Sequence, residues 1–214
     1  MIEEAVGHFR GALRKTFASA VPQVQFDWGI SDRVISEIGG RLIEDFVLQH
    51  LPRFIQQDLP KEASVCVTVP LSGRTMEDIR VCYSRDAVRV ELFVDIKGHN
   101  QLQRGSRPNL ASIRKCIDLY STPSRASEEV LIFFCRYRAE ISRSAAQTHL
   151  RLLVLPESFD ERHVVLLRNL SDSNLDPANI GSGGQLLLAR EDQIRVVNRT
   201  RSEFTEHLIR LRSR

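Results

Sequence analysis

Apolar residues recur at helical spacing in two stretches near the start of the chain. Across residues 2–18 they fall every three or four positions, which predicts an amphipathic helix. A second apolar stripe follows Asp32, the residue that we expect to cap the start of its helix. Gly39 and Gly40 lie inside this second stripe, and each should cost about 1 kcal/mol relative to alanine. A close approach by another part of the backbone would explain why the chain tolerates that cost.

After Pro60 the apolar period changes to two, which is typical of strands with one exposed face. Strands are expected at 64–69, 78–84 and 87–97, followed by a helix from about Asn109 to Tyr120. Residues 128–138 form a near-continuous apolar run, which indicates a strand covered on both faces. Strands flanked by helices predict an α/β or α+β fold built on one mixed central sheet.

The last third of the chain carries shorter signals. Strands are expected at 150–156, 163–170 and 185–189, and a basic amphipathic helix from about Thr200 to Arg212. The length of 214 residues, with 42% hydrophobic and 27% charged residues, fits one domain over residues 1–214. This composition excludes disordered, collagen-like and coiled-coil proteins.

Four cysteines lie far apart in the sequence without a CxxC pair, so no cysteine metal site is expected. The N-terminus shows no signal-peptide pattern, and no stretch approaches the roughly 20 apolar residues of a membrane span. A glycine-rich segment at 174–185 lacks a P-loop lysine, which argues against a nucleotide cofactor. These observations predict a reduced, soluble, cytoplasmic protein with no membrane partner.

Arginine dominates the basic residues, because only four of the 30 lysines and arginines are lysines. Arginine binds phosphates and guanine edges through two parallel hydrogen bonds, so the excess suits a nucleic-acid partner. Codon usage explains the same bias equally well.

Residues 78–97 are expected to form a hairpin. With Arg85 and Asp86 as a two-residue turn, Ile79 faces Leu92 and one side of the hairpin is entirely apolar. A slip of one residue would destroy that apolar side.

The other side of the hairpin carries Asp78, Asp95 and Lys97, with Asp78 diagonal to Asp95. Glu77 should point to the apolar side, so Asp78 is preferred over it. Crowded carboxylates need a partner, and Mg²⁺ takes a few carboxylate oxygens, keeps its waters and also binds substrate phosphate. The lysine could then hold or deprotonate an attacking water. An ordinary ion pair between Asp95 and Lys97 is the structural alternative.

Asp78 followed by Asp95-Ile96-Lys97 at the end of an apolar strand resembles the PD-(D/E)xK nuclease signature, with Glu77 replacing the usual proline. The resemblance implies a restriction-endonuclease-like core over about residues 33–138, in the order helix, three strands, helix, strand. It implies Mg²⁺, for which Mn²⁺ can substitute, held by Asp78, Asp95 and the Ile96 carbonyl. It also implies that Lys97 positions the attacking water.

Gly40 through Glu44 is similar to the G-x-x-x-E helix of many such nucleases, which implies that Glu44 supports the catalytic site. Downstream, Pro108-Asn109 resembles the segment after the catalytic lysine in the blunt-cutting group of Type II restriction endonucleases. This resemblance implies a sequence-specific, Mg²⁺-dependent endonuclease that cuts double-stranded DNA within a short palindrome. A two-fold symmetric site in turn implies a homodimer.

The segment after Lys97 has the composition of a DNA-contacting loop, because residues 98–117 include no acidic side chain. The expected DNA contacts are His99, Asn100, Gln103, Arg104, Ser106, Arg107 and Asn109. A solvated loop with Asn109 as a helix cap is the alternative. The strands and basic helix of residues 150–214 are expected to contact DNA or a second subunit.

Two rival functions stay open. One is a structure-specific or repair nuclease of the same superfamily, which would cut branched or damaged DNA. The other is a non-catalytic DNA-binding subunit that uses the same basic surface. Fold alone does not choose among these functions.

Overall fold

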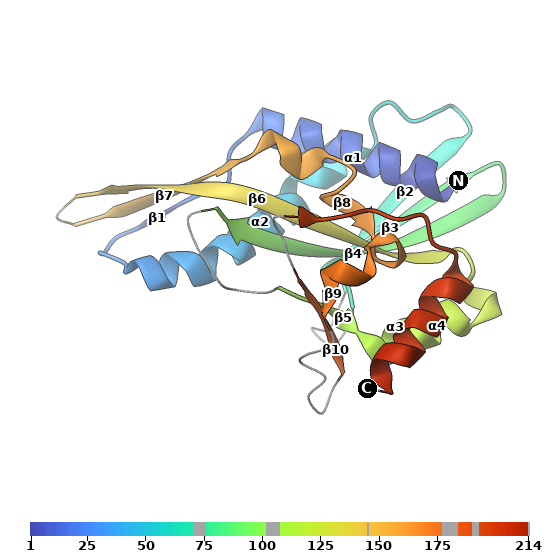
Figure 1. Ribbon diagram of the computed structural model, residues 1–214. Coiled ribbons are helices and arrows are strands. Elements are labelled where there is room, and N and C mark those ends of the chain that lie inside the picture. The colour runs from blue at the N-terminus through green and yellow to red at the C-terminus, as the bar shows by residue number, and fades with distance from the viewer. Residues whose placement is uncertain (71–75, 102–107, 145, 177–183, 190–192, 214) are drawn as a thin grey trace.

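One mixed sheet organises the computed structural model, which describes residues 1–70, 76–101, 108–144, 146–176, 184–189 and 193–213 (Figure 1). Its strands are β1 (Gln23–Phe26), β2 (Ala63–Thr68), β3 (Ile79–Arg85), β4 (Val88–Asn100), β6 (Glu128–Arg143), β7 (Thr148–Val154) and β8 (Val164–Leu166). The order across the sheet is β1-β7-β6-β4-β3-β2, and β8 also pairs with β6. Only β4 and β6 run parallel; the other pairs in this sheet are antiparallel among the described strands.

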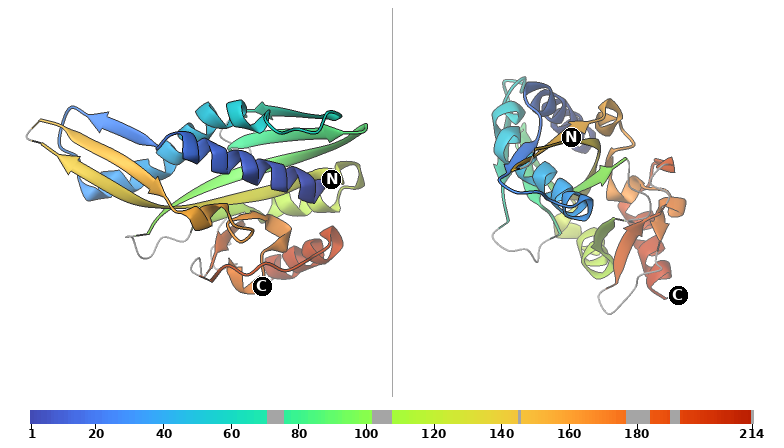
Figure 2. Two further views of the ribbon diagram at one scale, coloured as in Figure 1. Left: turned by 90° about the horizontal axis from the view of Figure 1, so that it is seen from above. Right: turned by 90° about the vertical axis from the view of Figure 1, so that its left-hand side faces the viewer.

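Two long helices, α1 (Ile2–Ser19) and α2 (Asp32–Ile55), cover one face of the sheet (Figure 2). The core on this face includes Phe9 and Leu13 of α1 and Ile43 of α2, all fully buried. The cap of α2 is Ser31, whose side chain accepts a hydrogen bond from the Val34 amide at 3.4 Å. The prediction of Asp32 as the cap was therefore wrong by one residue.

The opposite face carries a second core under α3 (Ile113–Ser121) and α4 (Arg201–Arg212). A small antiparallel sheet joins them, in the order β5 (Asn109–Ser112), β10 (Gln185–Leu188) and β9 (Leu175–Asp176). Phe134 of β6 and Phe204 of α4 are fully buried in this core. None of the helices among the described residues has the length and apolar character needed to span a bilayer.

The predicted fold class, a mixed central sheet flanked by helices, is confirmed. The order helix, three strands, helix, strand is found as α2, β2 to β4, α3 and β6, with the unpredicted short strand β5 between β4 and α3. The helix predicted from Asn109 was wrong in its first turn. Asn109 belongs to β5, where it pairs with Leu187 of β10, and α3 begins only at Ile113. Asn109 is therefore not a helix cap.

The hairpin of β3 and β4 turns one residue later than predicted. Asp86 and Ala87 have φ of 50° and 63°, the left-handed values that a two-residue turn of this type requires. Ile79 consequently pairs with Val94, two residues from its predicted partner Leu92. A shift of two residues leaves each side chain on its predicted face. Continuing this register places Asp78 opposite Asp95 rather than diagonal to it.

The glycine pair in α2 lies where the helix meets the sheet most closely. A Cβ on Gly98 of β4 would lie 2.9 Å from the Cα of Gly40. A Cβ on Gly39 would lie 2.1 Å from the hydroxyl oxygen of Tyr137, which is buried on β6. The predicted close approach of another backbone segment is thus confirmed, and the segment is β4.

We expect Gly98→Ala to lower the free energy of unfolding by about 1–3 kcal/mol, because the new methyl group forces α2 and β4 apart. Gly40→Ala is the matched control, because no described atom lies within 4 Å of the Cβ that it adds. The control should be neutral or stabilise the helix by up to about 1 kcal/mol. Urea denaturation followed by circular dichroism measures both, and equal losses in the two variants would contradict this packing.

A buried ion cluster attaches α4 to the main sheet. Glu129 of β6 accepts a hydrogen bond from Arg168 at 3.1 Å and lies 3.6 Å from a guanidinium nitrogen of Arg201. Arg201 also donates to the carbonyls of Glu128 and Leu119, at 2.5 and 2.7 Å. Burial raises the pKa of Glu129, and the two arginines oppose this effect. Arg201 of the basic C-terminal segment therefore makes its contacts inside the protein.

Arg168→Leu should lower the free energy of unfolding by about 2–4 kcal/mol, because it leaves the buried Glu129 carboxylate with one cation fewer. The double variant R168L/E129L should recover part of that loss, because the buried carboxylate is then absent. Arg125→Leu is the control, since the Asp118 and Glu128 carboxylates that it pairs with are more exposed than Glu129 and its loss should stay below about 1 kcal/mol. Chemical denaturation of the variants tests this, and a double variant no more stable than R168L would contradict it.

Candidate active site

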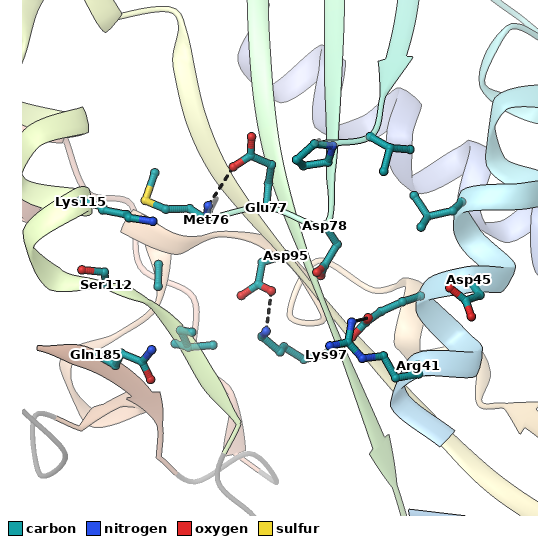
Figure 3. Close-up of a pocket in the computed structure, with 16 residues that line it drawn as sticks. Arg41, Asp45, Met76, Glu77, Asp78, Asp95, Lys97, Ser112, Lys115 and Gln185 are labelled. Carbon is teal, nitrogen blue, oxygen red and sulfur yellow. Dashed lines mark hydrogen bonds and ion pairs between the residues drawn. The ribbon is translucent and has the colours of Figure 1, made fainter. Parts of the chain in front are cut away.

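A pocket of about 380 Å³ opens between α2 and the start of α3, beside β4 (Figure 3). Its charged and polar lining comprises Arg41, Glu44 and Asp45 of α2, Glu77 and Asp78 before β3, Asp95 and Lys97 of β4, Ser112 and Lys115 around the start of α3, and Gln185 of β10. The four predicted catalytic residues, Glu44, Asp78, Asp95 and Lys97, therefore line one pocket although they come from three separate segments.

Asp78 is fixed to β4 by its backbone and by its side chain. Its amide donates to the Val94 carbonyl at 2.9 Å, and its Oδ2 accepts from the Ile96 amide at 2.7 Å. These two bonds hold the carboxylate beside Asp95 at the mouth of the β3–β4 hairpin. The Ile96 side chain, by contrast, points into the core on the other face, where it is 1% exposed.

Asp95 is a buried acid, with 4% of the residue exposed. Its Oδ1 lies 2.5 Å from Nζ of Lys97, whereas Oδ2 has no hydrogen-bond partner among the described residues. Burial raises the pKa of Asp95 to about 8; Lys97 opposes the rise and Asp78 adds to it. The protein thus holds a carboxyl group that lacks a compensating contact on one of its oxygens.

Glu44 reaches the pocket from α2, one helical turn after Gly40. Its carboxylate pairs with Arg41 at 2.7 Å, and 18% of its side chain is exposed. Burial raises the pKa of Glu44, and the negative charge of Asp78 raises it further. The electrostatic influence of Asp78 shows that these two acids belong to the same site.

The donor set suits a hard cation. The described residues include no group of three His, Cys, Asp or Glu side chains placed to hold an ion on their own. Mg²⁺ does not require such a group, because it is usually bound through one or two carboxylates, several waters and a substrate phosphate. Asp78 and Asp95 supply two adjacent carboxylates, and the unpartnered Oδ2 of Asp95 is an open ligand position.

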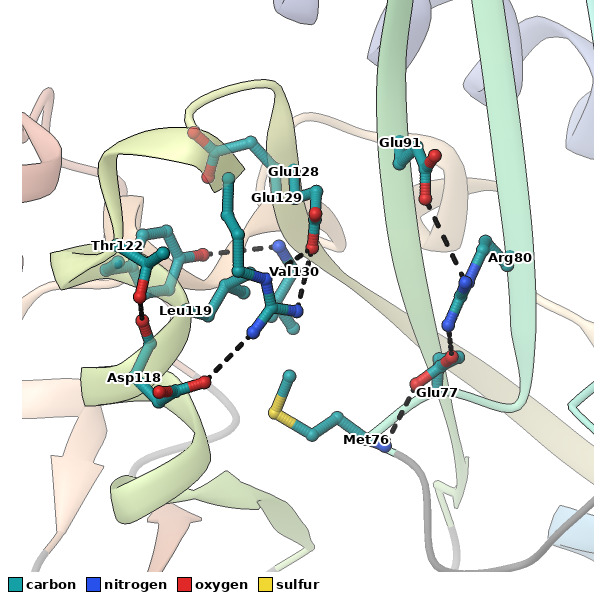
Figure 4. A network of polar contacts seen from close by, with 12 residues as sticks. Met76, Glu77, Arg80, Glu91, Asp118, Leu119, Thr122, Glu128, Glu129 and Val130 are labelled. Carbon is teal, nitrogen blue, oxygen red and sulfur yellow. Dashed lines mark hydrogen bonds and ion pairs between the residues drawn. The ribbon is translucent and has the colours of Figure 1, made fainter.

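Glu77 does not point into the apolar core, so that expectation was wrong. It accepts a hydrogen bond from Arg80 at 2.7 Å, and Arg80 also lies 3.9 Å from Glu91 (Figure 4). The Arg80 guanidinium lies over the ring of Phe93, 4.7 Å from its centroid. Arg80 therefore offsets the negative charge of Glu77, which lines the pocket beside Asp78.

The predicted DNA contacts are only partly placed. His99 is half-buried on β4, Asn100 is 8% exposed at the end of that strand, and Asn109 is exposed at the start of β5. Gln103, Arg104, Ser106 and Arg107 lie outside the described residues. The structure therefore places two of the seven at the end of β4 and Asn109 in the small second sheet, and only Asn109 among these three is exposed.

The wall of the pocket opposite α2 was not assigned to the site from the sequence. Ser112 and Lys115 come from the start of α3, and Gln185 comes from β10. Lys115 lies in the segment free of acidic residues, which was a usable signal. Gln185 is 70 residues downstream of Lys115 in an ordinary strand pattern, so only the pairing of β10 with β5 brings it here.

No protein-family model and no curated protein sequence matches the chain. Among solved structures 38 chains match, one of them described as NlaIV restriction endonuclease. That match covers 85% of this chain and 65% of the other, at 14% identity and a TM-score of 0.38. The chain thus spans less than two thirds of the length of that protein. A likeness at this level carries no argument about function, so the pocket itself has to support any proposal.

Asp95→Asn should stabilise the metal-free protein by about 1–2 kcal/mol, because a neutral amide replaces a carboxylate whose charge is disfavoured by burial. The same change should abolish the rise in Tm that Mg²⁺ produces in the wild type, because one ligand is lost. Calorimetry in EDTA and in a series of Mg²⁺ concentrations measures both effects.

Asp160→Asn is the control for this experiment, because it removes an exposed carboxylate away from the pocket. It should leave the stability and the Mg²⁺ effect close to those of the wild type. An undiminished Mg²⁺ effect in the Asp95 variant would exclude Asp95 as a ligand.

Proposed function

We propose that this protein is a Mg²⁺-dependent endonuclease of double-stranded DNA, of the Type II restriction class, that hydrolyses phosphodiester bonds within a short palindromic site. The observation that carries the proposal is the convergence of Asp78, Asp95, Lys97 and Glu44 in one pocket. Two carboxylates beside an ammonium group are suited to hold a divalent cation and a phosphate together.

Asp78 and Asp95 would hold Mg²⁺, with the Ile96 carbonyl as a further ligand, and Mn²⁺ can take the same position. A bound divalent ion lowers the pKa of water and offsets negative charge that develops on the phosphate. Lys97, held at 2.5 Å by Asp95, positions the attacking water and shares its proton. Glu44, at the α2 wall of the pocket, orients groups around the carboxylates rather than reacting itself.

The opposite wall supplies contacts for the DNA backbone. Lys115 and Ser112 line the pocket across from the carboxylates, where an ammonium and a hydroxyl group can bind phosphate oxygens. The predicted residues that would contact bases or grooves are His99, Asn100, Gln103, Arg104, Ser106, Arg107 and Asn109. A palindromic site would be bound by a homodimer, in the cytoplasm and without a nucleotide cofactor.

Lys97→Ala and Asp95→Ala should lower the cleavage rate by at least about 10²–10⁴-fold, because the group that handles the water or the metal ligand is lost. Glu44→Gln should have a smaller effect, about 10–100-fold, as expected of a supporting residue. The assay is cleavage of phage DNA with Mg²⁺, with circular dichroism to confirm folding.

Glu91→Gln is the control in this series, because Glu91 lies on the same strand and the same face as Asp95 but outside the pocket. It should cut at the wild-type rate. Unchanged cleavage by either alanine variant would exclude the proposed site.

Sequencing of the fragment ends separates the rival functions. Discrete bands with one sequence at every end support site-specific cleavage. Cleavage confined to branched or damaged DNA would instead indicate a structure-specific nuclease. Intact DNA with a salt-sensitive gel shift would indicate a non-catalytic DNA-binding subunit.

A further inference from the structure

Cys66 and Cys82 are directly paired on neighbouring antiparallel strands. The register of β2 and β3 places them opposite each other, and both thiols are free. Opposed residues in such a pair point to the same face, with Cα atoms about 4.5–5.5 Å apart. A disulfide bridges Cα atoms that are about 4.4–6.8 Å apart. The two cysteines, 16 positions apart in the sequence, therefore meet the backbone requirement for a cross-link.

Access to solvent separates this pair from the other two cysteines. Cys66 is exposed on β2, an edge strand of the sheet, and Cys82 is half-buried on β3. Cys116 and Cys135 are fully buried in the two cores. A reagent in solution can thus reach the pair in the folded protein but not the core thiols.

An arginine lies beside one of the paired sulfurs. Arg89 of β4 donates from its guanidinium group to Sγ of Cys82 at 3.4 Å. The thiolate is the species that attacks a disulfide bond, and Cys82 lies directly opposite Cys66 on the neighbouring strand. Cys82 is therefore placed to act as the second nucleophile once Cys66 has reacted.

We propose that Cys66 and Cys82 form a reversible intramolecular disulfide by exchange with a small disulfide of the glutathione class. The Cys66 thiolate attacks one sulfur of oxidised glutathione, which forms a mixed disulfide and releases one glutathione thiolate. The Cys82 thiolate then attacks the Cys66 sulfur and displaces the second glutathione. The two protein thiols lose two electrons and two protons in total, and one oxidised glutathione becomes two reduced molecules.

The cross-link would close a loop that includes part of the pocket. Residues 67–81 lie between the two cysteines, and Val69, Pro70 and Asp78 within them line the pocket. Oxidation would restrict the ends of β2 and β3 next to the carboxylates without using any of the proposed catalytic side chains. The proposal does not depend on nuclease activity, because it requires only the β2–β3 register and the exposure of the thiols.

Mass spectrometry of the full-length protein tests the proposal. The reduced protein is incubated in glutathione buffers with an increasing oxidised fraction, its free thiols are alkylated, and the digest is analysed without reduction. We expect a Cys66–Cys82 linked peptide from monomeric protein that disappears with dithiothreitol, together with a rise in Tm of several degrees. A stable mixed disulfide at Cys66, a Cys66-linked dimer or unmodified thiols as the sole product would overturn the proposal.

Two variants control for the geometry. Cys82→Ser should stop the reaction at the mixed disulfide on Cys66. In C66S/V67C the thiol moves to the next position of β2, which faces the opposite side of the sheet, so it should not link to Cys82. A cross-link between the relocated thiol and Cys82 in that folded variant would show that the register does not determine the reaction, and would also overturn the proposal.

Discussion

The contact between Gly40 and Gly98 determines how the pocket is built. Because Gly98 has no side chain, β4 approaches the backbone of α2 at Gly40 closely. Lys97 directly precedes Gly98 on β4, and Glu44 lies one helical turn after Gly40 on α2, on the same side of the helix. The close approach therefore brings a helix acid to the end of the strand that carries Asp95. Of the two helix-weakening glycines, Gly39 has a structural reason, because a Cβ there would collide with the hydroxyl group of Tyr137 on β6.

The pocket holds charge in a place that is unfavourable for folding. Asp95 is buried between the sheet and the second core, with Asp78 beside it and one of its oxygens without a hydrogen-bond partner among the described residues. Lys97 offsets only part of this cost. Glu77 shows the contrast, because Arg80 pairs with its carboxylate at 2.7 Å. Unfavourable charge that the fold retains without full compensation is typical of a site that binds a ligand.

The sequence predicted the arrangement of the core well, since long apolar periods determine the type and order of elements such as β4 and β6. The prediction was wrong where strand pairing over a long sequence distance overrides the local conformational preference of the residues. Asn109 begins a strand because β10 pairs with it, although Pro108-Asn109 alone favours the start of a helix. The hairpin turn was displaced by one residue, because Asp86 and Ala87 adopt positive φ without a glycine to signal it. Asp78 nevertheless lies on its predicted face of the hairpin, because the register shifted by two residues.

The part of the candidate site that lies on a single hairpin could be predicted from the sequence. Asp78, Asp95 and Lys97 lie on one hairpin, so their proximity follows from pleat and register. Gln185 enters through long-range pairing, and the pairing of Cys66 with Cys82 depends on the register of β2, which no motif specifies. Residues that meet within one hairpin are therefore predictable from the sequence. The opposite wall of the pocket and the Cys66–Cys82 pair depend on strand pairing that only the structure shows.

The central claim is that Asp78 and Asp95 jointly bind a divalent cation next to Lys97. The most direct measurement is anomalous X-ray scattering from crystals of the wild type grown with Mn²⁺ and a short DNA duplex. The account predicts a manganese peak in contact with carboxylate oxygens of both Asp78 and Asp95 and with a phosphate oxygen of the duplex. A pocket without manganese, or manganese bound to the protein only at other residues, would contradict it.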